Sequence, residues 1–476
     1  MSRPGRAIRL DFALFRHPPE ACRRVGKVTS LVSSDRTDIG RRRASNQDAK
    51  AVLPANPQQF RSRGWFFMVA DGMGAHAAGE LASAMAADRV PKIYEQRSQF
   101  SPPLALRLSL EQVNSEINAK GESGFEFKGM GTTCTTLVLL PRGAIVGHIG
   151  DSRCYRIRGG TIEQLSRDHS LVWELESAGG MSREQANDAA PKNIITRSMG
   201  PHARVDVDLE GPFPVNMGDV FLLCSDGLSG QVTDEEIGLL AAELEPQEAV
   251  TALIGLALVR GAPDNVTVVV ARTGEEEASK TSRKDEAWPL SEEATTNQRQ
   301  SHQSWTALTI AAACLLAALM FNPLSMLTKE ACLASETVRA VCLFGSIAAL
   351  MAAIAALLFA FSGFLAKPAR GRMLSPGEFL GKGPYRRYDC TPTEPLVEGI
   401  VASVEQSAEH LAPPDRDRTL SIVARARQHA AAGSFHEAVT AVAEAITIHT
   451  SDIEAARSDE TIRISSEPPP HPNPPA

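Results

Sequence analysis

The sequence lacks the features of a secreted, disulfide-bonded or nucleic-acid-binding protein. Its eight cysteines form no CxxC pair, and most stand inside apolar runs, which favours small buried side chains in a reducing compartment. The net charge of −7 offers no general excess of positive charge for nucleic acid, so no nucleic-acid partner is expected. The arginine-containing N-terminus has no apolar stretch followed by a small-residue cleavage site, so no signal peptide is predicted.

Motifs for covalent catalysis are also missing. The 476 residues contain neither a GxSxG nor a CxxxxxR pattern, so no serine or cysteine nucleophile is predicted. The length is sufficient for two or three parts at ~100–200 residues per domain.

Four acidic residues stand where short apolar runs begin or end. Such runs, bounded by glycines, predict buried β-strands. The acidic residues are Asp71 after FFMVA, Asp151 after VGHIG, Asp226 after VFLLCS, and Asp264 just before the run VTVVV. Carboxylates that converge repel one another unless a cation lies between them, and Mg²⁺ and Mn²⁺ prefer oxygen ligands. An Asp before Gly is also a common turn former, and Gly150-Asp151-Ser152 suits a hairpin turn.

The pattern of the first 272 residues predicts an α+β fold. Successive antiparallel strands are expected at 132–140, 144–149 and 154–158, with amphipathic helices over 79–94 and 102–120. Strands therefore occur in groups with helices inserted between the groups. This arrangement favours sheets with helices packed outside over a doubly wound fold.

Eight segments then carry a family resemblance. Their order and spacing resemble those of the bacterial metal-dependent serine/threonine protein phosphatases, the PPM or protein phosphatase 2C-like family, over about residues 25–272. They are RASNQD, VADGMG, GTT, GHIGDSR, SRDHS, NIITRSMG, LLCSDGL and GAPDNVT.

The resemblance implies a β-sandwich of two antiparallel sheets flanked by helices, with a centre of two Mn²⁺ or Mg²⁺ ions. Asp71 resembles the carboxylate that bridges both metals, and Gly72 the residue whose carbonyl binds one of them. Asp226 and Asp264 resemble ligands of the other metal. Asp151 resembles the ligand of a third, more weakly bound metal, a role that Asp226 shares.

The resemblance also implies residues that act on the substrate. Arg43 resembles the arginine that binds the substrate phosphate, and Asp48 an acid that orients metal-bound water; with Asp71 they form the predicted catalytic set. Because Arg43 follows two other arginines, a solvated basic turn is the alternative. The stretch 173–197 matches a mobile flap. The expected reaction is direct attack by a water or hydroxide held between the metals on phosphoserine or phosphothreonine.

Two positions depart from the family pattern, and the proton donor is left unassigned. Gln47 stands where many members have Glu, and Ala75 replaces a frequent Gly. His76, His148 and His169 are candidate general acids, although a histidine within a strand, such as His148, is more often packed in the core.

Beyond Arg272 the composition changes. Residues 273–304 are charged and polar and predict a flexible linker. The stretches 305–327 and 340–366 are free of charge and long enough to cross a bilayer, for which ~20 residues suffice. Basic residues after the second stretch predict a helical hairpin with both termini in the cytosol.

The outer parts of the chain are assigned by composition. Residues 1–24 predict an irregular basic arm, 367–418 a cytoplasmic linker of low order, and 459–476 a proline-rich disordered tail. Residues 419–458 resemble one tetratricopeptide-like helical hairpin, which cannot bury its own faces and could dock a protein partner.

The sequence therefore predicts a phosphatase held at the inner membrane by a multi-pass anchor, with its catalytic domain in the cytosol. Its expected substrates are the phosphoproteins made by a bacterial serine/threonine kinase. The alternative is a catalytically silent membrane scaffold that binds phosphoproteins and recruits partners.

Overall fold

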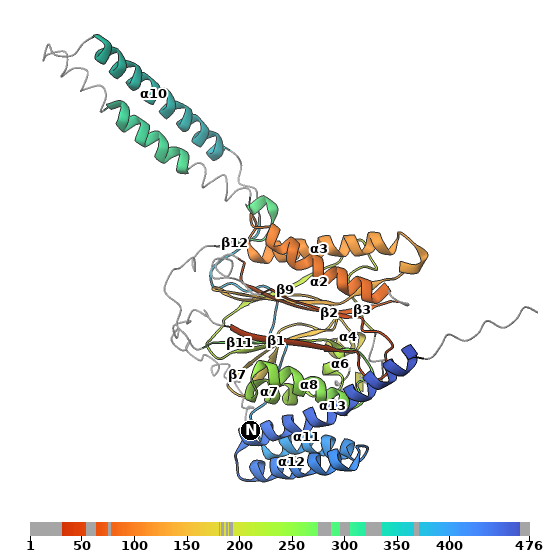
Figure 1. Cartoon of the computed structure of the whole chain (residues 1–476). Helices are drawn as coiled ribbons and strands as arrows, with labels where there is room; N and C mark the ends of the chain where they lie inside the picture. The colour runs from red at the N-terminus through yellow and green to blue at the C-terminus, as the bar shows by residue number, and fades with distance from the viewer. Residues whose placement is uncertain are drawn as a thin grey trace, which may run out of the picture.

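The computed structural model describes residues 31–53, 63–74, 78–179, 181, 185–186, 189, 194–274, 287–295, 305–319, 336–365 and 371–466. Two antiparallel sheets lie face to face at its centre, with helices outside each of them (Figure 1). This arrangement agrees with the predicted sandwich. The arm predicted for 1–24 lies outside the described residues.

Each sheet has six strands, and every pairing within them is antiparallel. The first runs in the order β1 (Leu31–Asp38), β11 (Val266–Thr273), β10 (Val220–Cys224), β7 (Arg153–Arg158), β8 (Thr161–Gln164) and β14 (Arg386–Asp389). The second runs β2 (Asp48–Leu53), β3 (Trp65–Met73), β5 (Cys134–Leu140), β6 (Gly143–Ile149) and β9 (Asp208–Phe213), with β4 (Gly131–Thr132) beside β3.

The alternation of side chains along β3 explains why it lies in the centre. Phe67 and Val69 face the layer between the two sheets, whereas Phe66 and Met68 face the layer beneath the helices. Successive side chains of a strand point to opposite faces, so an apolar run has both faces buried. The strand that carries Asp71 is therefore held on both sides.

Helices cover the outer face of each sheet. α2 (Ala78–Gln96) and α3 (Pro102–Gly121) pack on the second sheet, and α7 (Asp234–Glu243) and α8 (Pro246–Val259) on the first (Figure 1). The shorter helices are η1 (Phe125–Phe127), α4 (Leu171–Ser177) and α6 (Asp226–Ser229).

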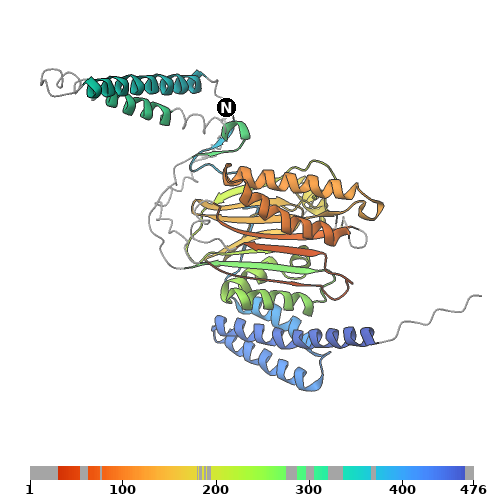
Figure 2. The same ribbon diagram turned by 45° about the horizontal axis from the view of Figure 1, so that its top comes forward.

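Three C-terminal helices form a further layer on α7 and α8 (Figure 2). They are α11 (Glu394–Ala408), α12 (Pro413–Ala431) and α13 (Phe435–Ser466). Leu256 of α8 shares one buried cluster with Val401 of α11 and Ile446 of α13. The hairpin predicted for 419–458 thus corresponds to α12 and α13, and its apolar face is covered by the chain itself.

The linkers predicted on either side of the apolar stretches are partly wrong. Within 367–418, residues 371–411 contain β13 (Met373–Leu374), β14 and α11; within 273–304, β12 (Trp288–Pro289) pairs with β13. These short strands depend on partners distant in sequence, and proline and glycine interrupt the local pattern of apolar residues. The strands could therefore not be predicted from periodicity. The tail predicted for 459–476 begins within α13, and residues 467–476 lie outside the described part.

Among the described residues, one helix is long and apolar enough to cross a membrane. It is the stretch Leu343–Ala360 of α10 (Glu336–Leu365), with a mean hydropathy of 2.4 and 11% of its residues buried. The first predicted span, 305–327, is described only as the shorter apolar helix Trp305–Leu319. The two lie side by side, and Ser346 Oγ donates to the Ala318 carbonyl at 3.4 Å (Figure 1).

Candidate active site

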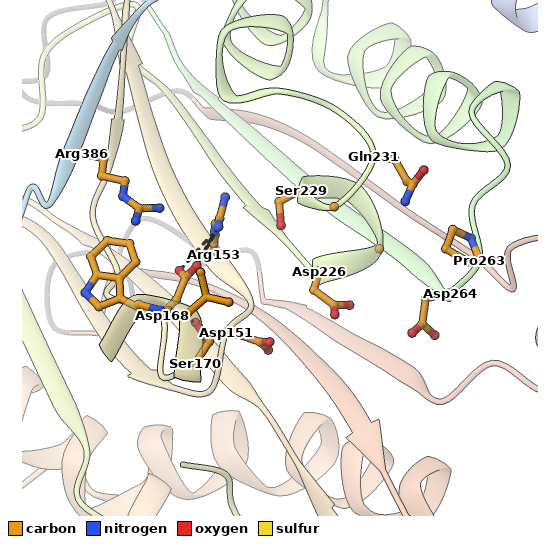
Figure 3. Close-up of a pocket in the computed structure, with 14 residues that line it drawn as sticks. Asp151, Arg153, Asp168, Ser170, Asp226, Ser229, Gln231, Pro263, Asp264 and Arg386 are labelled. Atoms are coloured by element: carbon orange, nitrogen blue, oxygen red, sulfur yellow. Dashed lines mark hydrogen bonds and ion pairs between the residues drawn. The ribbon is translucent and has the colours of Figure 1, made fainter. Parts of the chain in front are cut away.

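The acidic residues singled out from the sequence come together at one end of the sandwich. Asp48 of β2 stands opposite Asp71 of β3 in the strand register. Asp226 begins α6 directly after β10, and Asp264 lies just before β11. Asp151, Asp226 and Asp264 border a pocket of about 360 Å³ (Figure 3).

Backbone hydrogen bonds fix the position of Asp71. Its N–H donates to Thr133 Oγ1 at 2.8 Å, and its carbonyl accepts from the Thr133 N–H at 2.8 Å and from Thr132 Oγ1 at 2.9 Å. The main chain of Asp71 is thus satisfied by its neighbours on one side. Its carboxylate remains available for the cluster.

Gly72 is required because two stretches of backbone pass close to each other. A Cβ at this position would lie 2.2 Å from the carbonyl oxygen of Gly79. The Gly72 N–H donates to the Gln47 carbonyl at 3.0 Å. The contact draws the loop before β2 towards the end of β3.

Asp48 is held through one of its two oxygens. Its Oδ2 accepts from Ser225 Oγ and from Thr267 Oγ1, each at 2.7 Å, while Oδ1 has no hydrogen-bond partner. Burial raises the pKa of Asp48 to about 7, against the opposing effect of the two hydroxyls. The free oxygen lies beside the other carboxylates and could orient a water.

The remaining carboxylates share this electrostatic situation. Burial, followed by repulsion from neighbouring carboxylates, raises the pKa of Asp71, Asp151 and Asp226. The negative charges of Asp48, Asp226 and Asp151 each raise the pKa of Asp71, because the four carboxylates lie close together. These acidic groups therefore lie close enough together to repel one another.

The donor set fits hard divalent cations. Oδ1 of Asp48, Asp151 and Asp226 is buried without a hydrogen-bond partner. In the described part of the chain no three His, Cys, Asp or Glu side chains already surround one point. Fewer protein ligands suffice for Mg²⁺, because it keeps several waters and is usually bound by only one or two carboxylates.

Arg43 lies beside the carboxylates, where its guanidinium pairs with the predicted metal ligand Asp264. Its Nη2 donates to Asp264 Oδ2 at 2.7 Å, and 49% of its side chain is exposed. The loop that carries Arg43 is tied down by Asn265, which donates from Nδ2 to the carbonyls of Ile39 and Ser45 and accepts the Gln47 N–H at 2.8 Å. A half-exposed ion pair contributes only ~0–1 kcal/mol, so Arg43 is free to turn towards a phosphate.

The candidate proton donors are placed differently from one another. His148 is fully buried and shares a hydrogen bond with the Thr135 hydroxyl. His169 accepts the Gly150 N–H at its Nδ1, at 3.0 Å, and its Nε2 lies 2.9 Å from Asp208 Oδ2. Neither lines the pocket. His76 and Ala75 lie outside the described residues, as does half of the predicted flap beyond α4.

Several residues of the site escaped the sequence reasoning. Ser225 and Asn265 directly adjoin the predicted ligands Asp226 and Asp264, and Thr267 follows Asp264 by three residues, so their positions in CSDG and DNVT were the available signal. Arg153, which pairs with Asp168 at 2.7 Å, follows Asp151 in GDSR. Arg386 also lines the pocket, yet it stands far beyond the resembling segments, and no local pattern identified it.

A sequence model described as protein phosphatase 2C matches residues 40–257. A serine/threonine phosphatase stp of Listeria welshimeri is 34% identical over 240 residues, which are 49% of this chain and 93% of that protein. Protein phosphatase PhpP of Streptococcus pneumoniae is 35% identical over 252 residues, 51% of this chain and 97% of that protein.

Solved structures give the same kind of match. The serine/threonine phosphatase PstP/Ppp of Mycobacterium tuberculosis is 35% identical, with a TM-score of 0.46, over 52% of this chain and 99% of that one. A catalytic domain of PstP in complex with two manganese ions is 34% identical, with a TM-score of 0.44, over 52% and 99%. Since the chain covers nearly the whole of the stp and PhpP relatives, it belongs to the protein phosphatase 2C family and is a protein serine/threonine phosphatase.

Proposed function

We propose that this enzyme hydrolyses phosphoserine and phosphothreonine in proteins, at a centre of two Mn²⁺ or Mg²⁺ ions. The observation that carries the proposal is the group of buried carboxylate oxygens without partners around one pocket. We assign the metal ligands to Asp71, Gly72, Asp226 and Asp264, with Asp151 for a third, weaker ion. A solved relative with two manganese ions supports the number of metals.

Two bound cations would supply charge neutralisation at the phosphoryl oxygens and a lowered pKa for a water between them. Asp48, fixed through Oδ2 by Ser225 and Thr267, would orient that water with its free oxygen. Arg43 would leave Asp264 and bind the phosphate through two parallel hydrogen bonds from its planar guanidinium. No residue needs to form a covalent bond to the phosphoryl group.

The proposed location is the cytoplasmic face of the inner membrane. α10 is the candidate span, and its exposed apolar side chains, which include Phe344 and Leu358, are typical of a lipid-facing helix. The apolar helix Trp305–Leu319 lies beside it and would form the other half of a hairpin. Lys367, Arg370 and Arg372 follow α10 and favour a cytoplasmic C-terminus.

The test compares the whole chain with its Asp71→Asn variant on a phosphothreonine peptide, with Mn²⁺ and with a chelator. The whole chain is used because α11–α13 share a core with α7 and α8. We expect hydrolysis to require Mn²⁺ and to fall by roughly 100-fold or more in the variant, since metal stabilisation of the transition state amounts to several kcal/mol. The exposed Asp206→Asn is the matched control.

A second readout does not depend on turnover. Mn²⁺ should raise the melting temperature of the wild-type protein, because a ligand that binds only the folded state stabilises it, and should do so less for Asp71→Asn. Hydrolysis that persists without metal, or with full rate in Asp71→Asn, would contradict the metal mechanism. An absence of hydrolysis at millimolar Mn²⁺ would support the silent scaffold.

A further inference from the structure

The chain that follows the candidate membrane helix returns to the catalytic domain. We name residues 371–390 the return segment. Its β13 pairs with β12, and its Leu380 exchanges backbone hydrogen bonds with Gly211 of β9. Its β14 then extends the first sheet by pairing with β8, with Arg386 opposite Gln164.

A buried acid of the catalytic domain depends on the return segment. Glu210 of β9 is 2% exposed, and its Oε2 accepts the N–H groups of Lys382 and Gly383, each at 2.9 Å. Its Oε1 accepts the hydroxyl of Tyr385 at 2.5 Å. Buried polar groups need such partners, so the return segment is an integral part of the fold and not a passing linker.

β14 brings a cation to the wall of the active-site pocket. The Arg386 guanidinium stacks on the ring of Trp173 in α4, 3.8 Å from its centroid, and forms an ion pair with Glu176 one turn further on. Tyr385 meets the edge of the same ring, with centroids 6.1 Å apart. Only 12% of the Arg386 side chain is exposed, so its position is well defined.

The two ends of the pocket differ in charge. Figure 3 shows Arg386 at the end away from Asp226 and Asp264. Arg153 also lines the pocket, but it is paired with Asp168 at 2.7 Å and with Asp234 at 3.4 Å. The Arg386 end therefore offers an arginine beside an aromatic ring, while the opposite end holds the carboxylates of Asp226 and Asp264.

We propose that Arg386 is a specificity-determining residue that binds a second anionic group of the substrate, a carboxylate or a second phosphate near the phosphoserine or phosphothreonine. The inference rests on the proposed function of the same pocket. A guanidinium matches both anions with a planar pair of donors. Residue 386 lies more than 100 residues beyond the end of the family match at 40–257, so the match does not include this arginine.

The ion pair with Glu176 is compatible with this role. Glu176 is 33% exposed, so an incoming anion can approach from its side and share the guanidinium donors of Arg386 with it. Stacking on Trp173 holds the guanidinium in place. Removal of the Glu176 charge should therefore strengthen the preference for anionic substrates.

The experiment compares phosphothreonine peptides that differ at one position, two to four residues from the phosphothreonine. That position carries Gln, Glu or a non-hydrolysable phosphonate analogue of phosphoserine. We expect the wild-type chain with Mn²⁺ to prefer at least one anionic peptide, and Arg386→Ala to reduce kcat/KM for it by about tenfold relative to the Gln peptide, mainly through KM. The Glu and phosphonate arms identify which anion is bound.

Matched variants separate recognition from support of the fold. Arg387→Ala lies on the same strand, 64% exposed and paired with Glu163 at 2.8 Å, and should leave the preference unchanged. Arg386→Lys should retain part of it, and Glu176→Gln should increase it. Hydrolysis of p-nitrophenyl phosphate, and its loss in Asp71→Asn, reports on the proposed function independently of the preference.

The proposal is overturned if the wild-type enzyme does not distinguish the three peptides. It is also overturned if Arg386→Ala lowers kcat/KM for all of them, and for p-nitrophenyl phosphate, by the same factor, since Arg386 would then only support α4. If Arg386→Ala fails to fold, Glu176→Gln decides, and an unchanged preference in that variant counts against the proposal.

Discussion

His148 is a histidine that the fold keeps neutral. It is fully buried in β6, its Nδ1 lies 2.9 Å from Thr135 Oγ1, and its Nε2 has no hydrogen-bond partner. Burial, reinforced by the nearby His169, lowers the pKa of His148 to about 3. Protonation of this residue is therefore coupled to unfolding.

The sign of the effect follows from the lowered pKa. The unfolded chain takes up a proton at His148 below pH ~6.5, whereas the folded chain does so only near pH 3. Its contribution to stability is complete above pH ~6.5 and is lost as the pH falls from there towards 3. Between pH 7.5 and 5.0 the wild-type protein should lose about 2 kcal/mol from this residue.

His148→Gln should remove this loss. Urea unfolding at the two pH values measures it, with the exposed His202→Gln as the control, which should keep the wild-type dependence. The explanation fails if His148→Gln and the wild-type protein lose the same free energy of unfolding between pH 7.5 and 5.0.

At the residue scale, the site residues that could be predicted from the sequence are those within the segments that resemble the family. Asp71, Asp226 and Asp264 occupy strand ends that the apolar runs already marked, and the structure brings them together. The hydroxyls of Ser225 and Thr267 were not identified, because their role depends on the distance to Asp48 across two sheets. The neighbours of Arg386 are equally distant along the chain.

Among the elements, α8 has the most restricted surroundings. After its polar first turn, every residue from Ala252 to Val259 is buried, as expected of a helix between a sheet and another helix. Gly255 marks its closest approach to α13, where a Cβ would lie 2.3 Å from Ile446 Cγ2. The docking of the C-terminal layer therefore depends on the absence of a side chain at this position.

Gly255→Val should push α13 away from α8 and reduce the free energy of unfolding by about 1–3 kcal/mol, the usual effect of overpacking. Gly399→Ala in α11 is the matched control. A Cβ there would meet only Glu236 Oε1, at 3.8 Å, so the change should be neutral or stabilise the helix by up to ~1 kcal/mol. Thermal and urea unfolding measure both variants, and an equal effect would show that α13 is not tightly docked.

The elements that the sequence predicted well have a strong local period. α2, α3 and the hairpin of α12 and α13 show apolar residues at helical spacing. α11 has the same spacing at Val397, Ile400, Val401 and Val404, but it begins just after a proline-rich stretch and was assigned to a linker. β14 has four residues, and only its pairing with β8 makes it a strand.

For the whole molecule, the apolar helices form a projection whose two ends meet. In Figures 1 and 2 they extend away from the sandwich. At their base the Leu290 N–H donates to the Arg372 carbonyl at 2.8 Å, and a Cβ at Gly371 would lie 2.4 Å from Cβ of Ala294. The chain thus leaves and re-enters the catalytic part at one place.

Replacement of residues 296–370 by a short glycine–serine link should yield a protein that stays in the supernatant after carbonate extraction. The wild-type chain should remain with the membrane pellet, because the candidate span of α10 is retained. Phosphatase activity with Mn²⁺ and the peptide preference should be unchanged, since β12, β13 and Arg386 are kept. Wild-type protein recovered in the supernatant would refute the proposed anchor.

The return segment also sets an order of events during synthesis. All the predicted metal ligands have been synthesised once β11 is complete, whereas the partners of Glu210 and the Arg386 side of the pocket follow only after α10. A nascent chain can thus assemble the carboxylate cluster early, but it acquires its full pocket only after the apolar helices have been made. Completion of the substrate-binding surface would then coincide with arrival at the membrane.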